Sequence, residues 1–223
     1  MRSALVLLSG GMDSTTLLHR LRHEHPAADL HALSLHYGQR HARELTMARW
    51  QAERLGVPYQ VGDLAFLGPL VAAGTTLVSA GGEVPALDSV PEAMRDQPPT
   101  YVPNRNMILL AIAAAHAEAH GIGDLFYGAQ AQDEYGYWDC TPEFIARLNH
   151  TFSLNRRQPV QIHAPFAHTR KADIVRFGVE LGVDFGHTWT CYRGGERPCG
   201  VCPACVERAA AFAEAGEPDP LVD

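Results

Sequence analysis

The sequence lacks any run of basic residues and any long hydrophobic stretch. Its 223 residues contain 18 Lys and Arg against 25 Asp and Glu, which gives a formal net charge of −7. Because proteins that bind duplex nucleic acid or tRNA usually carry a basic face, this charge disfavours nucleic acid as a partner. No apolar run approaches the length that spans a bilayer, and no signal-peptide pattern opens the chain. We therefore expect a cytoplasmic protein with no membrane partner.

Cysteine is also scarce, and it is confined almost entirely to one region. Of five cysteines, Cys191, Cys199, Cys202 and Cys205 lie within the last 33 residues, separated by gaps of seven, two and two residues. Four thiolates at this spacing suit a tetrahedral Zn²⁺ ion, and four protein ligands leave no open position for chemistry. The sequence therefore predicts a structural zinc site, with disulfides, free thiols or an iron–sulfur cluster as the alternatives.

A glycine-rich segment at residues 9–14, S-G-G-M-D-S, follows the apolar run 4–8 and precedes the helical pattern 15–22. Gly10 and Gly11 allow the backbone to approach a ligand, and a helix N-terminus offers N–H groups to phosphate. The segment has neither the lysine of a Walker A loop nor the three spaced glycines of a dinucleotide fingerprint. It resembles the pyrophosphate loop (PP-loop) of the ATP pyrophosphatases, which cleave ATP to AMP and pyrophosphate while adenylating a substrate. An ordinary strand-to-helix turn capped by Ser or Asp is the alternative.

Apolar runs and helical spacing alternate along the chain. This alternation predicts an α/β fold with a doubly wound parallel sheet, in which ligands lie beyond the carboxyl ends of the strands. The expected strands are 4–8, 30–37, 59–61, 125–129 and 160–163, and the expected helices are 15–22, 42–55, 107–120, 142–155, 169–181 and 203–215. Glycines and prolines predict an irregular insertion at 68–103. We expect an ATP-binding domain at 1–186 and a zinc module with a final helix at 187–223.

Two cations occupy positions that a bound phosphate would explain. Lys171 stands near the start of a predicted helix, where a positive charge is misplaced unless an anion lies nearby. Arg105 lies between two asparagines in a proline-bounded segment, and its guanidinium suits a phosphate or a carboxylate. We predict phosphate contacts for both side chains, with solvated surface positions as the alternative.

Residues 130–140 combine three carboxylates with three aromatic side chains. A carboxylate accepts the adjacent N–H donors of a guanine-like base and an aromatic ring stacks on its face, so this loop is a candidate base-binding site. Helix capping and interface packing are the alternative. Cys140 is more typical of a buried structural cysteine than of a nucleophile, because no histidine partner is assignable. His36, His41 and His163 lie near strand ends and are further candidates.

Motifs spread over nearly the whole chain give a more specific resemblance. They are S-G-G-M-D-S-T-T, Y-G-Q-R-H with R-E-L, Y-V-P-N-R-N, D-C-T-P-E-F, K-A-D-I-V-R and W-T-C-Y-R-G-G-E-R-P-C-G-V-C-P-A-C. In combination they resemble the 7-cyano-7-deazaguanine synthase (QueC) family. The resemblance implies a PP-loop ATPase domain, a four-cysteine zinc site and often a homodimer. It also implies conversion of 7-carboxy-7-deazaguanine, ammonia and ATP to the nitrile preQ0, the precursor of queuosine and archaeosine.

The loop and the resemblance together predict the site residues, with ATP, Mg²⁺ and Zn²⁺ as the bound species. Asp13, Lys171 and Arg105 are the predicted catalytic residues. The predicted ATP-binding residues are Leu8, Ser9, Gly10, Gly11, Met12, Asp13, Ser14, Thr15, His36, Tyr37, Gln39 and Arg40. The predicted substrate-binding residues are Asn106, Asp133, Glu134, Tyr137 and Asp139. The expected chemistry is an acyl adenylate that ammonia converts to an amide, followed by a second adenylation and elimination to the nitrile.

Three motifs differ from the usual pattern of the family. Residues 133–140 are D-E-Y-G-Y-W-D-C, where the family usually has D-Y-S-G-Y-P-D-C; His36 replaces an aspartate and Asn104 a glycine. The phosphate-binding motifs are intact, so the differences concern the substrate or the acceptor. The alternatives are a paralogue that transfers the deazaguanine carboxylate to a different amine, a PP-loop enzyme that modifies tRNA, and a zinc-stabilised binding module without turnover.

Overall fold

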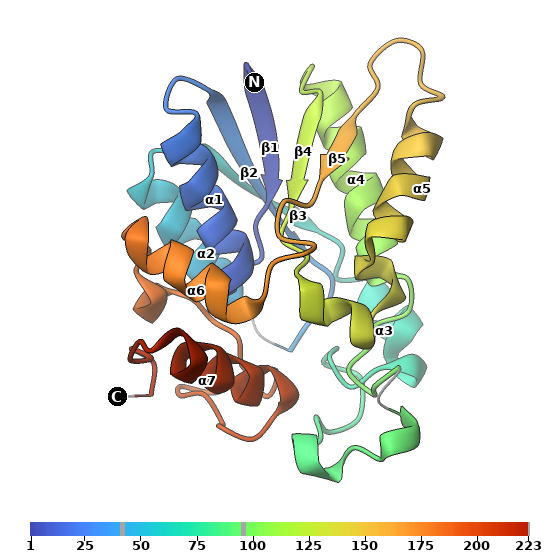
Figure 1. Ribbon diagram of the computed structural model, residues 1–223. Coiled ribbons are helices and arrows are strands. Elements are labelled where there is room, and N and C mark those ends of the chain that lie inside the picture. The colour runs from blue at the N-terminus through green and yellow to red at the C-terminus, as the bar shows by residue number, and fades with distance from the viewer. Residues whose placement is uncertain (41–42, 95–96, 223) are drawn as a thin grey trace.

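The computed structural model describes residues 1–40, 43–94 and 97–222, apart from the side chains of Glu134 and Tyr135. In this part of the chain a five-stranded sheet has the order β3-β2-β1-β4-β5 (Figure 1). The strands are β1 (Ser3–Leu7), β2 (Asp29–His36), β3 (Tyr59–Asp63), β4 (Asp124–Tyr127) and β5 (Gln161–His163). Every neighbouring pair is parallel, because helical connections return the chain to the same edge of the sheet. The predicted doubly wound parallel sheet is confirmed.

Helices cover both faces of the sheet (Figure 1). On one face lie α1 (Met12–Glu24), α2 (Arg43–Arg54) and α6 (Lys171–Glu180), and on the other lie α4 (Arg105–Ala119) and α5 (Pro142–Phe152). α7 (Pro203–Ala215) lies beyond the carboxyl ends of the strands and packs against α6. Among the described residues, no helix combines the length and the hydrophobicity needed to span a bilayer.

The segment expected as an irregular insertion contains little regular structure in its described residues, 68–94 and 97–103. It holds most of the short helix α3 (Leu67–Val71) and the single 3₁₀ turns Ala72–Gly74, Leu87–Ser89 and Glu92–Met94. Arg40, just beyond β2, donates to the carbonyl oxygens of Thr76 and Gly81 at 2.9 and 2.6 Å. These bonds satisfy backbone groups that a loop cannot pair internally, and they attach the insertion to the end of β2.

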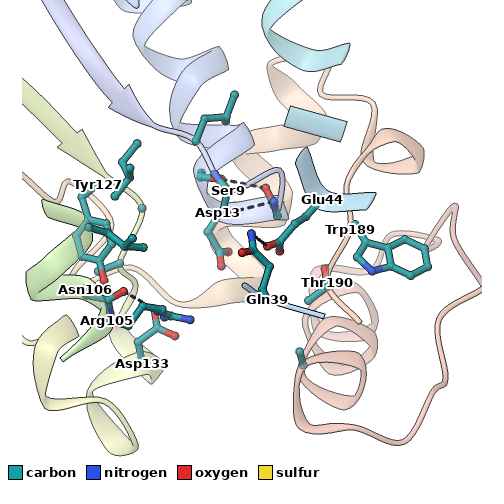
Figure 2. Close-up of a pocket in the computed structure, with 18 of the residues that line it drawn as sticks. Ser9, Asp13, Gln39, Glu44, Arg105, Asn106, Tyr127, Asp133, Trp189 and Thr190 are labelled. Atoms are coloured by element: carbon teal, nitrogen blue, oxygen red, sulfur yellow. Dashed lines mark hydrogen bonds between the residues drawn. The ribbon is translucent and has the colours of Figure 1, made fainter. Parts of the chain in front are cut away.

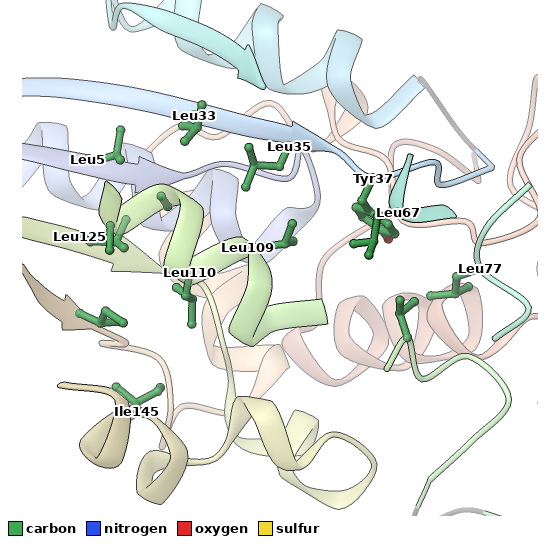
Figure 3. Packing of buried hydrophobic residues seen from close by; sticks show 14 of the residues in the cluster. Leu5, Leu33, Leu35, Tyr37, Leu67, Leu77, Leu109, Leu110, Leu125 and Ile145 are labelled. Atoms are coloured by element: carbon green, nitrogen blue, oxygen red, sulfur yellow. The ribbon is translucent and has the colours of Figure 1, made fainter. Parts of the chain in front are cut away.

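β1 separates two hydrophobic cores because its side chains alternate between the faces of the sheet. Ala4 and Val6 pack with residues of α1, α2 and α6, whereas Leu5 packs with residues of α4 on the opposite face. Figure 3 shows Leu5 and Leu125 of the sheet beside Leu110 of α4. A strand that is buried on both faces requires a continuous apolar run, which explains the pattern at residues 4–8.

The C-terminal segment packs into the same core as α4, where Trp189, Cys191 and Cys202 belong to the buried cluster. Arg208 of α7 is 2% exposed and donates to both carboxylate oxygens of Asp219 at 2.8 Å. Breaking a buried bidentate ion pair leaves an unpaired charge in the interior, so this contact fixes α7 firmly. One side of α7 thereby faces the carboxyl ends of the strands.

Candidate active site

The predicted phosphate loop turns from β1 into α1 at the carboxyl edge of the sheet (Figure 2). α1 begins at Met12 with Gly11 as its N-cap, and no side chain in the described part of the chain caps the helix. Its first N–H groups and the partial positive charge of the helix end are therefore available to an anion. Ser9 and Ser14 hold the loop in shape: their hydroxyl oxygens lie 2.9 Å apart, and Ser9 Oγ accepts the N–H of Gly11 at 3.2 Å.

The two glycines of the loop have different roles. Gly10 has a φ of +83°, in the left-handed region that favours glycine. A Cβ atom at Gly10 would lie 2.9 Å from the backbone nitrogen of Ala48 and closer still to the carbonyl oxygen of Glu44. Gly11 has an ordinary φ of −77°, and a Cβ there would first meet Ser9 Oγ at 3.3 Å. Gly10 therefore permits the close approach of α2 to the loop.

Gly10→Ala is expected to lower the free energy of unfolding by about 2 to 4 kcal/mol, because the added Cβ meets backbone atoms and alanine disfavours positive φ. Gly11→Ala is the matched control and should lower it by less than about 1 kcal/mol. Chemical denaturation followed by circular dichroism measures both values. Equal stabilities of the two variants would contradict the role assigned to Gly10.

A cavity opens beside the loop, beyond the carboxyl ends of the central strands (Figure 2). Its charged and amide side chains come from both halves of the sheet and from α7. They are Asp13, Gln39, Glu44, Arg105, Asn106, Asp133, Lys171 and Glu207. In Figure 2, Gln39 and Glu44 lie on one side of Asp13, and Arg105 and Asp133 lie on the other. A polar cavity beside an uncapped helix N-terminus at this edge is the usual place for a nucleotide in doubly wound sheets.

Lys171 is the first residue of α6 and is 7% exposed. Its Nζ atom lies 3.0 Å from Glu207 Oε2 and 3.7 Å from Asp13 Oδ2. Burial alone lowers the pKa of Lys171, but Asp13, Glu207 and Asp133 together raise it well above its ordinary value. The side chain therefore stays charged. The anions that offset it here are carboxylates of the protein, and the phosphate contact stays a prediction.

Asp13 is the carboxylate on the phosphate loop itself. Burial raises its pKa to about 6, although Lys171 acts in the opposite direction. Its Oδ1 atom is buried without a hydrogen-bond partner in the part of the chain that the structure describes. A buried oxygen of this kind is costly unless a ligand supplies the partner. Mg²⁺ prefers carboxylate and phosphate oxygens, so Asp13, with the carboxylate of Asp133 nearby, suits the predicted ion.

Arg105, at the start of α4, is surrounded by aromatic and amide side chains. Its guanidinium carbon lies 6.0 Å from the centre of the Tyr37 ring, and its Nε donates to Asn106 Oδ1 at 3.1 Å. Tyr137 lines the same cavity, and its hydroxyl is held 2.8 Å from Thr100 Oγ1. Aromatic rings beside a guanidinium suit a flat heterocycle that carries a negatively charged group.

Cys140 lines the cavity as a buried thiol. Burial raises its pKa to about 12. Its Sγ accepts the Nδ2–H of Asn106 at 3.1 Å and lies 3.3 Å from the hydroxyl of Tyr127. A thiol that stays neutral is a poor nucleophile, so these contacts are those of a structural cysteine.

Most of the predicted site residues surround this cavity. Those that line it are Leu8, Ser9, Gly11, Asp13, Ser14, Tyr37, Gln39, Arg105, Asn106, Asp133, Tyr137 and Lys171. Gly10, Met12 and Thr15 do not line it: Gly10 contacts α2, and the side chains of Met12 and Thr15 are buried in the interior. These three residues shape the loop and anchor α1.

Other predicted residues have partners away from the cavity. His36, at the end of β2, places its Nδ1 3.4 Å from Asp63 Oδ1. His163 Nε2 lies 2.7 Å from Asp124 Oδ1, between β4 and β5. Arg40, as described, binds carbonyl oxygens of the insertion. The structure therefore places these three side chains outside the lining of the cavity.

The predicted base-binding loop is divided between the cavity and the start of α4. Asp133 and Tyr137 line the cavity. Asp139 does not: it is 1% exposed, and its Oδ2 accepts the backbone N–H of Asn106 in the first turn of α4 at 3.0 Å. The side chain of Glu134, together with the whole of His41, lies outside the described residues.

Several residues of the lining were not among the predicted site residues. They are Glu44, Tyr127, Thr190, Tyr192 and Glu207. Glu44 had a signal, because it is the central residue of the R-E-L motif shared with the QueC family. Glu207 had none: it lies in the segment assigned to zinc, and only the packing of α7 against α6 brings it to Lys171.

The four C-terminal cysteines converge at the N-terminus of α7, where their Sγ atoms all lie within 4.8 Å of one another. A Zn–S distance of about 2.3 Å places tetrahedral sulfurs about 3.8 Å apart, so a small contraction would enclose the ion. The N–H groups of Cys199 and Cys202 donate to Sγ of Cys191 and Cys199 at 3.4 and 3.3 Å, which stabilises thiolates. The cluster can hold a metal, and zinc as its identity stays a prediction.

Comparison with known proteins finds a family that spans the chain. Residues 3–216 match the family described as "Queuosine biosynthesis protein QueC". The 7-cyano-7-deazaguanine synthase of Chromohalobacter salexigens is 45% identical over 219 residues, which cover 98% of this chain and 85% of the relative. The synthase of Marinobacter nauticus is 43% identical over 219 residues, with coverages of 98% and 96%. The residues matched by the family, 3–216, span both the glycine-rich loop and the cysteine cluster.

Solved structures share the fold at low sequence identity. The U34-tRNA thiolase NcsA from Methanococcus maripaludis, with its [4Fe-4S] cluster, superposes with a TM-score of 0.53 at 16% identity, over 95% of this chain and 63% of that one. The "predicted subunit of tRNA methyltransferase" from Methanocaldococcus jannaschii gives a TM-score of 0.50 at 16% identity, with coverages of 97% and 89%. Identities this low support the fold alone.

Proposed function

Because the chain belongs to the QueC family of queuosine biosynthesis proteins, we propose that it converts 7-carboxy-7-deazaguanine and ammonia to 7-cyano-7-deazaguanine (preQ0) at the expense of ATP. This makes it a carbon–nitrogen ligase. The observation that carries the proposal is the match of almost the whole chain to proteins named as this synthase. The cavity beside the N-terminus of α1, which no described side chain caps, supports it. The names of the relatives favour this reaction over transfer to a different amine.

Activation of the carboxylate is the first task of the site. A carboxylate is a poor acyl donor, so its oxygen attacks the α-phosphorus of ATP, an acyl adenylate forms and pyrophosphate leaves. The N–H groups at the start of α1 bind the pyrophosphate, and Lys171 and Arg105 supply positive charge at the cavity wall. Asp13 would hold Mg²⁺, which would offset the charge that builds on the departing phosphates. Ammonia then displaces AMP, and a second adenylation of the amide oxygen precedes elimination to the nitrile.

Recognition of the base falls to the wall formed by the loop after β4. Asp133 accepts N–H donors there, and Tyr137 covers a face of the heterocycle. The four cysteines would hold Zn²⁺, which would fix the N-terminus of α7 and leave no open position for chemistry, since all four ligands come from the protein. We also propose a homodimer, on the family resemblance alone.

Mass spectrometry of the products from ATP, 7-carboxy-7-deazaguanine and ammonia tests the proposal. The expected products are preQ0, AMP and pyrophosphate, with about two AMP for each preQ0, because each activation consumes one ATP by the proposed chemistry. ADP and phosphate as products, or a carboxamide as the end product, would contradict it. AMP release that requires tRNA or another amine would support the alternatives instead.

A further inference from the structure

The proposed reaction requires a proton acceptor beside the reacting carbon, and this inference rests on that proposed function. Ammonia brings a nitrogen with three hydrogens, whereas the nitrile nitrogen carries none. One hydrogen leaves as a proton when the amide forms, and two leave when the nitrile forms. A positioned base typically accelerates such transfers by about 10²–10⁴-fold. None of the groups assigned to adenylation supplies this base.

Three of the four described carboxylates that line the cavity have other partners. Asp13 and Glu207 lie 3.7 and 3.0 Å from Lys171 Nζ. Protonation of these carboxylates would leave the buried ammonium of Lys171 without an anion to offset it. Asp133 accepts the backbone N–H and the side-chain Nε2–H of Gln130 at 3.1 and 3.0 Å, one on each oxygen. These contacts lower the pKa values of Asp13 and Asp133 against the larger opposing effect of burial, and they hold the three carboxylates in fixed positions.

Glu44, the fourth, has no ion-pair partner among the described residues. It lies in the first turn of α2, and its Oε1 accepts the Nε2–H of Gln39 at 3.0 Å. Gln39 is itself oriented, because its Oε1 accepts the backbone N–H of Tyr37 at 2.7 Å. The close approach that Gly10 permits places the backbone of Glu44 directly against the phosphate loop. Figure 2 shows Glu44 and Gln39 across the cavity from Arg105.

The environment of Glu44 suits a group that gains and loses a proton near neutral pH. Burial raises its pKa to about 7, while the amide of Gln39 and the guanidinium of Arg105 act in the opposite direction. Among the described residues, the other titratable groups that face it are Tyr37 and Tyr59, whose pKa values burial also raises, so both stay neutral. A base with a pKa close to the working pH accepts a proton and returns it to solvent efficiently.

We propose that Glu44 accepts the protons that the nitrogen loses. As ammonia forms the C–N bond, the C–O bond to AMP breaks and one N–H proton passes to the Glu44 carboxylate, then to solvent. After the amide oxygen displaces pyrophosphate from the second ATP, Glu44 takes an N–H proton from the cationic adduct. A final N–H proton leaves to Glu44 as the C–O bond to AMP breaks and the C≡N bond forms. Adenylation of the carboxylate involves no N–H proton and does not use Glu44.

The competing explanation is that Glu44 only stabilises α2, since a carboxylate in the first turn interacts favourably with the helix dipole. Glu44→Gln separates the two roles, with Glu53→Gln on the exposed side of the same helix as the matched control. Carboxylate-dependent exchange of pyrophosphate into ATP, measured without ammonia, reports adenylation. Formation of preQ0 reports the ammonia steps. Hydroxylamine, which is neutral at neutral pH and a strong nucleophile, traps the adenylate as a hydroxamate with little need for a base.

Glu44→Gln should keep pyrophosphate exchange and hydroxamate formation near the wild-type rates and lower preQ0 formation about 10²–10⁴-fold. Wild-type kcat/KM, calculated for unprotonated NH3 so that the titration of ammonium does not contribute, should fall as the pH drops below about 7, where the base becomes protonated, and the residual activity of the variant should lack this limb. Glu44→Asp should restore part of the rate. The proposal would be overturned if Glu44→Gln formed preQ0 at the wild-type rate, or if its rates of pyrophosphate exchange and preQ0 formation fell by the same factor. Absence of preQ0 from the wild-type enzyme would instead overturn the proposed function.

Discussion

Lys171→Met is expected to lower turnover by about 10²–10³-fold and to destabilise the protein by about 3 to 5 kcal/mol. The side chain is the only cation within ion-pair distance of Asp13 and Glu207 among the described residues, and Lys171 is the only lysine in the chain. Without it, the carboxylates of Asp13 and Glu207 lose the cation that they share, and no ammonium acts on the phosphates. Steady-state kinetics and chemical denaturation measure the two effects.

The loss of stability in Lys171→Met should depend on pH with a defined sign. Burial already raises the pKa of Asp13 to about 6 in spite of Lys171, and removing the lysine raises it further. Protonation then relieves the repulsion at low pH, so the difference from the wild type should grow as the pH rises from about 5 to 8. Arg170→Met is the control, because Arg170 is 63% exposed and pairs with Glu214 at the surface. A stability loss that is equal for both variants would refute the charged cluster around the buried Lys171.

Cys199→Ser is expected to release the bound metal and to yield poorly folded protein. A structural zinc site contributes about 10–16 kcal/mol of binding free energy in small zinc domains, and that energy is part of folding. Here the four sulfurs lie at the start of α7 and belong to, or pack against, the core around α4, so their loss disturbs Glu207 and the main core together. Elemental analysis and the yield of soluble protein measure the outcome.

Cys140→Ser is the matched control for the metal site. Cys140 is also buried, but it lies against Tyr127 and Asn106 and away from the cluster. This variant should retain about one metal ion per chain and lose at most about 1 to 3 kcal/mol from its altered hydrogen bonds. Full metal content in Cys199→Ser would contradict the ligand assignment. If the wild-type protein contained iron and inorganic sulfide, the site would be assigned to an iron–sulfur cluster instead of zinc.

The elements were largely predictable because strands and helices follow local periodicity. The apolar run 4–8 corresponds to β1 at Ser3–Leu7, and the expected final helix coincides with α7 at Pro203–Ala215. The start of the first helix was predicted too late: it begins at Met12, within the loop motif. Its first turn packs against the loop and the cavity instead of showing regular apolar spacing, so periodicity does not reveal it.

The candidate base loop shows where local reasoning ends. Its composition predicted three carboxylates for one ligand, yet Asp139 is used by the N-terminus of α4. The choice between capping a helix and binding a ligand depends on which helix end lies against the loop, and that end is more than thirty residues away in sequence. Asp133, from the same loop, lines the cavity with the residues of the phosphate loop.

By itself, the sequence determined the parallel α/β architecture, the candidate phosphate loop and the cysteine cluster, because each depends on residues that are close together along the chain. Only the tertiary structure decided that Asp13, Lys171 and Glu207 form one charged cluster and that Glu44 lies beside the loop without an ion-pair partner among the described residues. These residues come from α1, α6, α7 and α2, and they meet because the strand order and the packing of α7 bring distant helix ends to the same edge of the sheet. No local spacing encodes that convergence.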